Sequence, residues 1–167
     1  MIHSLRWFPL VLALIFSTAG VASGGKNENA SWLGEGDTVP EGELVTMEGK
    51  AVSLAEALDG RPAVLIFYRG GWCPYCNQHL AELMEVEPKL VDLGYRILAI
   101  SPDRPEELRE TEQKHGMQYT LFSDSSMEVA DAFGLGFKVG ALTRASYAVH
   151  GIDLEAASGQ DHHRLPH

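Results

Sequence analysis

Short apolar runs and longer segments with helical spacing follow one another along the chain. Three apolar runs of strand length lie within residues 63–68, 95–101 and 119–123. The segment after the first run has apolar residues at the spacing of an amphipathic helix, namely Cys76, Leu80, Leu83, Met84, Leu90 and Val91. Strands that alternate with helices predict an α/β fold, in which helices cover both faces of a sheet with a parallel core.

The segment before the first apolar run predicts a hairpin and a short helix. Residues 44–46 and 51–54 are of strand type and are separated by a turn sequence. Ser53 and Glu56 have the spacing of a capping box. We therefore expect a helix over residues 54–58 that begins directly after the hairpin.

Two further helices are expected in the second half of the chain. A polar helix over residues 105–115 is predicted to end at Gly116. A shorter helix over residues 127–133 has an apolar face, and Ser125 or Ser126 can cap its N-terminus.

The beginning of the chain differs in composition from the rest. Residues 1–23 contain one basic side chain, Arg6, no acidic side chain, and an apolar stretch that ends in small residues. This pattern is typical of a secretory signal peptide and is short for a membrane-spanning helix, although an uncleaved anchor remains an alternative. We expect residues 24–35 to form a flexible lead-in and residues 36–167 to form one domain in the periplasm or outside the cell.

The charge balance and the cysteine count restrict the possible partners. The chain has 13 Lys and Arg against 23 Asp and Glu, which gives a formal net charge of −10. Such an acidic protein is not expected to bind nucleic acid. The only two cysteines are Cys73 and Cys76. In an oxidising compartment they would be found as a disulfide unless a dedicated reductant acts on them, and nothing in the sequence indicates a cofactor.

The two cysteines lie where the first apolar strand gives way to the amphipathic helix. A helix N-terminus offers unpaired N–H groups and partial positive charge, which stabilise a thiolate, and Pro74 suits the first helical position. Residues three apart share one helix face, so the sulfurs of Cys73 and Cys76 can form a disulfide. A zinc site would need two further ligands, and a structural disulfide would more usually close a longer loop. A redox-active dithiol is therefore favoured over metal binding and over inert packing.

Six short segments between residues 36 and 124 are informative in combination. They are Gly36-Asp37 with Val39-Pro40, Gly49 with Val52-Ser53-Leu54, residues 64–70, Trp72-Cys73-Pro74-Tyr75-Cys76, Ile100-Ser101-Pro102-Asp103 and Leu121-Phe122-Ser123-Asp124. Together they resemble the alkyl hydroperoxide reductase and thiol-specific antioxidant (AhpC/TSA) family of peroxiredoxin-like proteins, and the resemblance extends to about residue 166. It implies a thioredoxin-like three-layer sandwich, reduction of hydroperoxides by a cysteine thiolate, and recycling by a thioredoxin-like or membrane-relay thiol reductant.

The dithiol segment departs from the pattern of this family. Typical peroxiredoxins carry Pro-x-x-x-Thr-x-x-Cys, and a gapless placement puts Cys76 at the peroxidatic position, Cys73 in place of the Thr and Arg69 in place of the Pro. In a thioredoxin-type interpretation, Cys73 is instead the nucleophile and Cys76 the resolving thiol. The position of Cys73 at the helix start favours it as the more exposed thiol with the lower pKa.

Neighbouring side chains have candidate supporting roles. Arg69 can add positive charge near the sulfurs, and Trp72 can cover the disulfide, although core packing is an alternative for this side chain. Pro74 and Tyr75 flank the cysteines, and His79 is expected on the helix surface.

Residues 151–167 contain few candidate core residues. Leu165-Pro166 resembles the loop that carries a cis-proline opposite the dithiol in thioredoxin-like proteins. In the family, a hairpin and a final helix follow that proline. We therefore expect a fold without the last two strands and the closing helix, with an unpaired sheet edge and reduced stability.

Three functions agree with these features. The leading hypothesis is a thiol-dependent peroxidase, and an exported protein thiol-disulfide oxidoreductase is the alternative. A copper-binding or assembly protein is a further alternative, because His162, His163 and His167 cluster near the end of the chain. The sequence does not indicate an oligomeric state.

Overall fold

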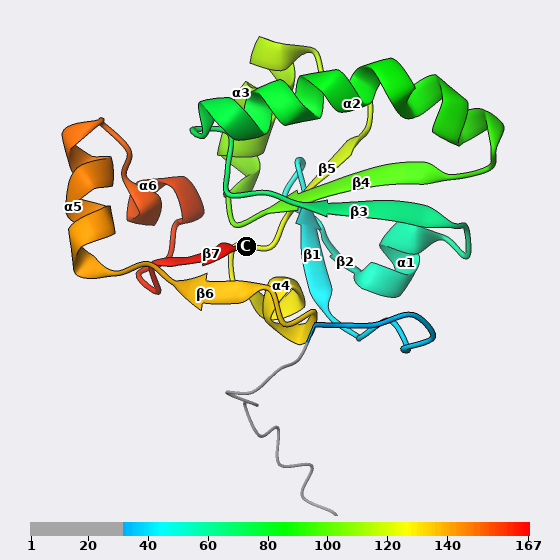
Figure 1. Ribbon diagram of the computed structural model, residues 1–167, viewed down its shortest axis with the longest axis horizontal. Coiled ribbons are helices and arrows are strands. Elements are labelled where there is room, and N and C mark those ends of the chain that lie inside the picture. The colour runs from blue at the N-terminus through cyan, green and yellow to red at the C-terminus, as the bar shows by residue number, and fades with distance from the viewer. Residues whose placement is uncertain (1–31) are drawn as a thin grey trace, which may run out of the picture.

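The computed structural model describes residues 32–167 (Figure 1). The expected signal peptide and most of the lead-in lie outside the described residues. The elements in chain order are β1 (Glu43–Thr46), β2 (Ala51–Ser53), α1 (Leu54–Leu58), β3 (Ala63–Phe67), α2 (Pro74–Asp92), β4 (Arg96–Ser101), α3 (Pro105–His115), β5 (Thr120–Ser123), α4 (Glu128–Ala132), β6 (Gly136–Lys138), α5 (Ala141–Val149), α6 (Leu154–Ser158) and β7 (Arg164–Pro166).

The central sheet has five strands in the order β2-β1-β5-β4-β3. Strand β4 pairs in parallel with β3 and with β5, which confirms the predicted parallel core. Strand β1 is antiparallel to both β2 and β5. Strand β3, which leads into the dithiol, lies at the edge of this sheet.

Helices cover both faces of the sheet, so the predicted three-layer arrangement is confirmed. Helices α2 and α3 lie on one face, and α1 and α4 lie on the other (Figure 1). Along β4, Ile97 and Ala99 belong to the core under α2 and α3, whereas Leu98 and Ile100 belong to the core over α1 and α4. This strand is apolar on both faces because each face meets a helical layer.

The capping signals that lie close together in sequence are confirmed. The Ser53 hydroxyl accepts from the Glu56 N–H at 3.2 Å, and the Glu56 carboxylate accepts from the Ser53 N–H at 2.8 Å. Helix α3 ends at Gly116, whose φ of 64° allows the left-handed turn. Residues at or next to these two helix ends therefore set the boundaries.

The prediction that Ser125 or Ser126 caps α4 is wrong, because Asp124 is the main capping residue. The Asp124 carboxylate accepts from the N–H groups of Val129 at 3.2 Å and Ala130 at 2.8 Å. Ser126 makes only one long contact, at 3.4 Å, with the Glu128 N–H. A buried carboxylate at the end of β5 satisfies two helix donors at once, which a serine hydroxyl cannot do as well.

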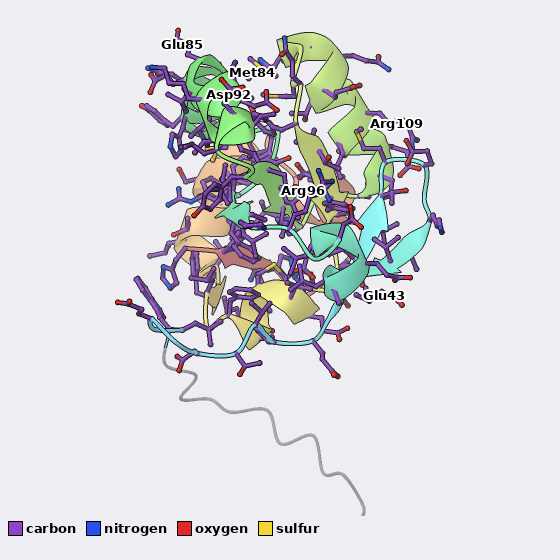
Figure 2. All side chains as sticks on the ribbon, turned by 90° about the vertical axis from the view of Figure 1, so that its right-hand side faces the viewer. Glu43, Met84, Glu85, Asp92, Arg96 and Arg109 are labelled. Carbon is purple, nitrogen blue, oxygen red and sulfur yellow. The ribbon has the colours of Figure 1, made fainter. Side chains whose placement is uncertain are left out.

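Two arginines connect elements that are distant in sequence (Figure 2). Arg96, at the start of β4, donates to the carbonyl of Ala57 in α1 at 2.9 Å. Arg109 of α3 donates to the carbonyl of Met47, in the turn after β1.

Within residues 32–167, no helix has the length and apolar character needed to cross a membrane.

The last part of the chain forms a small lobe beside the sandwich (Figure 1). Strand β6 pairs with β7 in antiparallel register, and α5 and α6 lie between them in sequence. The expectation of few core residues after Gly151 is confirmed, because the apolar cluster of this lobe has only two buried residues from this segment, Leu154 and Leu165, which are buried with Val139. The expected cis-proline loop is wrong. Pro166 lies in β7 opposite Gly136, and residues 32–167 contain no cis peptide bond.

Candidate active site

The dithiol lies at the junction between β3 and α2, as the sequence predicts. Cys73 is the N-cap of α2 and has extended backbone angles, and Pro74 occupies the first turn. The Cys73 N–H donates to the Gly70 carbonyl at 3.1 Å, which closes the turn before the helix. The Cys73 carbonyl in turn accepts from the Asn77 N–H at 3.1 Å.

Both cysteines are free thiols, and their order of exposure is the reverse of the prediction. Cys73 is only 5% exposed, whereas Cys76 is half-buried. The prediction that Cys73 is the more exposed thiol is therefore wrong. Cys73 is the N-cap residue and is buried at the turn that its N–H closes on the Gly70 carbonyl, so the start of the helix is not exposed here.

The surroundings of Cys76 act on its pKa in opposite directions. The pKa of Cys76 is raised to about 11, mainly by burial and also by a hydrogen bond with the Cys73 side chain. The backbone N–H of Arg69 and the charge of its guanidinium lower the pKa of Cys76 and offset part of this rise. The guanidinium of Arg69 thus lies close enough to Cys76 to act on its pKa.

The other predicted supporting residues lie in different environments. The ring of Trp72 lies tilted against that of Tyr147 with ring centroids 5.3 Å apart, and Trp72 packs on the apolar cluster of the C-terminal lobe. It therefore joins the dithiol turn to this lobe. Tyr75 is 83% exposed, and His79 is also exposed on α2. Pro166 contributes to β7 and not to a loop facing the cysteines.

Three side chains that sequence analysis did not select hold the turn before Cys73. Gly71 donates its N–H to the Asp103 carboxylate at 2.6 Å, and its carbonyl accepts from the Asn77 amide at 2.7 Å. Thr111 of α3 packs against its Cα. A signal for Asp103 was available, since it follows β4 directly, and the carboxyl ends of the parallel strands β3 and β4 meet at one edge.

Replacement of Gly71 by alanine tests this close packing. A Cβ on Gly71 would lie 1.8 Å from the Thr111 hydroxyl oxygen, so we expect Gly71→Ala to lower the free energy of unfolding by about 1–3 kcal/mol. Chemical denaturation measures the change. Gly34→Ala is the matched control, because a Cβ there meets only an ordinary contact at 3.6 Å. Equal stability of the two variants would contradict the packing argument.

An open hollow of about 520 Å³ lies beside the turn, between the start of α2 and the end of α3. Its lining includes Trp72, Pro74, Asn77, Lys114 and His115. The hollow thus borders the turn before the dithiol, and neither cysteine is part of its lining.

The histidines near the end of the chain have separate partners. His162 contacts the Ser125 carbonyl at 2.7 Å, and His163 contacts the Glu155 carboxylate at 2.6 Å. His167 stacks on the ring of Phe137 with centroids 4.5 Å apart. Across the described part of the chain, no three His, Cys, Asp or Glu side chains are arranged to hold a metal ion.

A dithiol at the N-terminus of a helix, reached from a parallel strand, defines a thiol-based redox protein of thioredoxin-like architecture. Residues 36–151 match the family model described as AhpC/TSA family, and the chain belongs to this family. It is 28% identical to Peroxiredoxin Bcp of Escherichia coli over 132 residues. These residues are 78% of this chain and 84% of that protein.

Solved structures agree with this assignment. The crystal structure of Peroxidoxin BcpB from Mycobacterium tuberculosis matches with a TM-score of 0.57 and 25% identity, over 62% of this chain and 67% of that one. Reduced Prx3 from Vibrio vulnificus, solved in complex with H₂O₂, has the same fold with a TM-score of 0.61 at 18% identity, over 65% and 72% of the two chains. The protein is a thiol-dependent peroxidase, and the comparisons do not favour the disulfide oxidoreductase or copper alternatives.

Proposed function

We propose that this peroxidase attacks hydroperoxides with Cys76 and resolves the product with Cys73. The observation that carries the proposal is exposure, because Cys76 is half-buried and Cys73 is 5% exposed. A second observation supports it. Burial raises the pKa of Cys76 overall, and the backbone N–H and the guanidinium of Arg69 act against this rise by favouring the thiolate form. The proposal also agrees with the gapless placement on the family pattern, in which Cys76 corresponds to the peroxidatic cysteine.

The first step is a two-electron oxidation of sulfur. The Cys76 thiolate attacks the terminal peroxide oxygen, the O–O bond breaks, and the alkoxide leaves and takes up a proton to become an alcohol or water. Cys76 is then a sulfenic acid. The Cys73 thiolate attacks its sulfur and forms the S–S bond, and the hydroxide that leaves takes up a proton to become water.

The third step returns the two electrons. A thioredoxin-type dithiol attacks the Cys73–Cys76 disulfide, passes through a mixed disulfide, and is itself released as a disulfide. Both cysteines become thiols again. The hollow lined by Trp72, Pro74 and Lys114 lies beside the turn that carries this disulfide.

Peroxide-dependent disulfide formation tests the proposal. The reduced protein is mixed with one equivalent of H₂O₂, and intact and peptide mass spectrometry follow the thiols. We expect the loss of two hydrogen atoms and a peptide pair linked through Cys73 and Cys76. Steady peroxide consumption should then require an added dithiol. Reduction of protein disulfides without any peroxide consumption would contradict the proposal and support the oxidoreductase alternative.

We also propose that the protein acts outside the cytoplasm. The support is the composition of residues 1–23, with one basic residue before an apolar stretch that ends in small residues. Expression in a bacterial host, followed by fractionation and N-terminal sequencing, tests this. A cytoplasmic product with an uncut N-terminus would contradict it.

A further inference from the structure

The two peptide groups that flank Gly71, just before the dithiol, are each held by a buried side chain. The Gly71 N–H donates to Asp103 at 2.6 Å, and the Gly71 carbonyl accepts from the Asn77 amide at 2.7 Å. Asp103 is 1% exposed and Asn77 is 8% exposed. Cys73 is two residues further on, and its own N–H is bound to the Gly70 carbonyl. The position of Cys73 therefore depends on how firmly the Gly71 peptide is held.

The carboxylate of Asp103 has a fixed place under this turn. The Asp103 N–H donates to the Ser101 hydroxyl at 3.2 Å, which holds the residue at the end of β4. A Cβ on Gly70 would lie 2.6 Å from Asp103 Oδ1, and one on Gly71 would lie 1.8 Å from Thr111 Oγ1. The turn thus lies directly on the carboxylate and on α3. Asp103 Oδ1 has no hydrogen-bond partner in the described part of the chain.

We propose that Asp103 is a positioning residue whose ionised carboxylate holds the Gly70–Gly71 turn, and through it Cys73, ready to close the disulfide on Cys76. The inference rests on the proposed roles of the two cysteines. A charge-assisted hydrogen bond is about twice as strong as a neutral one, so the ionised form holds the Gly71 peptide more firmly than the protonated form. Asp103 does not touch the reacting sulfur atoms, and its effect passes through the turn.

The surroundings of Asp103 put its proton equilibrium near neutral pH. The pKa of Asp103 is raised to about 7, mainly by burial and also by the carboxylate of Glu107, and the Gly71 N–H and the neighbouring Ser101 hydroxyl offset part of this rise. The Tyr68 hydroxyl also lies near it. The remaining titratable or charged groups that line the hollows next to Asp103 are Glu110, Lys114, His162, His163 and Arg164.

The buried charge does not benefit the fold. Because the pKa of Asp103 is raised on folding, the folded protein holds this proton between pH values of about 3.8 and 7 while the unfolded chain does not. This group's contribution to stability therefore falls as the pH rises through that range. A residue with only a structural role would not need the ionised form, whereas a residue that tightens the dithiol turn would.

The test compares the unchanged protein with Asp103→Asn across a range of pH. The amide keeps the shape and can accept from the Gly71 N–H, but it carries no charge. Stopped-flow mixing with H₂O₂ separates sulfenic acid formation on Cys76 from closure of the disulfide. We expect the disulfide to close about tenfold faster in the unchanged protein than in Asp103→Asn at pH 8. Below about pH 6 both side chains are neutral, and the ratio of the two rates should approach one.

Two further variants make the test specific. Asp124 is also a buried aspartate with a raised pKa, about 6, but it caps α4. Asp124→Asn should leave closure rates unchanged at every pH. Ser101→Ala removes a hydrogen bond that lowers the pKa of Asp103, so it should move the midpoint of the closure-rate profile to higher pH. This shift remains measurable if Asp103→Asn does not fold.

The outcomes separate the inference from the function on which it rests. If the unchanged protein forms no disulfide with peroxide, the roles of the cysteines and of Asp103 both fail. If the disulfide forms, and the rate ratio is close to one or independent of pH, the role of Asp103 alone is wrong. An unmoved midpoint in Ser101→Ala would also overturn it. A ratio that rises with pH, together with an unaffected Asp124→Asn protein, supports the positioning role.

Discussion

Replacement of Cys76 by serine should lower the steady rate of hydroperoxide reduction by at least about a thousandfold, which is typical of the loss of a nucleophile. The hydroxyl of serine is not ionised near neutral pH and does not reduce peroxides. Cys73 does not substitute for Cys76, because its side chain is 5% exposed under the turn. The assay is peroxide consumption with an excess of an added dithiol.

Cys73→Ser is the matched control, because it removes the second sulfur and keeps the first. A single turnover should still oxidise Cys76, and a sulfenic-acid trap should label that residue. The disulfide cannot form, so the trapped species should persist. If the trap labelled Cys73 in the Cys76→Ser protein at the rate of the unchanged enzyme, the attacking and resolving roles would be the reverse of those proposed.

The sequence predicted the elements whose boundaries depend on nearby residues. The capping box of Ser53 and Glu56 and the end of α3 at Gly116 are local features, and both are present. The strand, turn, dithiol and helix around Cys73 were predicted for the same reason. The alternation of apolar runs and helical segments was sufficient for the three-layer class, because only helices on both faces explain a strand as apolar as β4.

Features that depend on tertiary contacts were missed or wrong. The exposure of Cys73 is set by the fold of the turn over the helix start, which spacing alone does not determine. The role of Asp103 depends on a contact across 32 positions in sequence. The C-terminal lobe was missed because its core is small, with Leu154 and Leu165 separated by a polar stretch that has no clear period. Each of these features can be recognised only when the positions of the strands and turns relative to one another are known.

The reaction of Cys76 with a thiolate-selective alkylator should become steadily faster as the pH rises. The pKa of Cys76 is raised to about 11, mainly by burial, so the thiolate is a minor species at neutral pH. Its fraction should rise about tenfold for each pH unit and reach about a thousandfold between pH 7 and pH 10. Peptide mapping of brief alkylation reactions measures the rate at Cys76 separately from that at Cys73.

Two variants identify the cause of this dependence. Cys73→Ala removes a hydrogen bond and a charge that both raise the pKa of Cys76, so its profile should level off at lower pH. Arg69→Met removes a charge that lowers the same pKa and should shift the profile to higher pH. A rate that is already constant above pH 8 in the unchanged protein would show that burial does not control this thiol. Since only a thiolate attacks peroxide, the same profile should govern the first step of turnover.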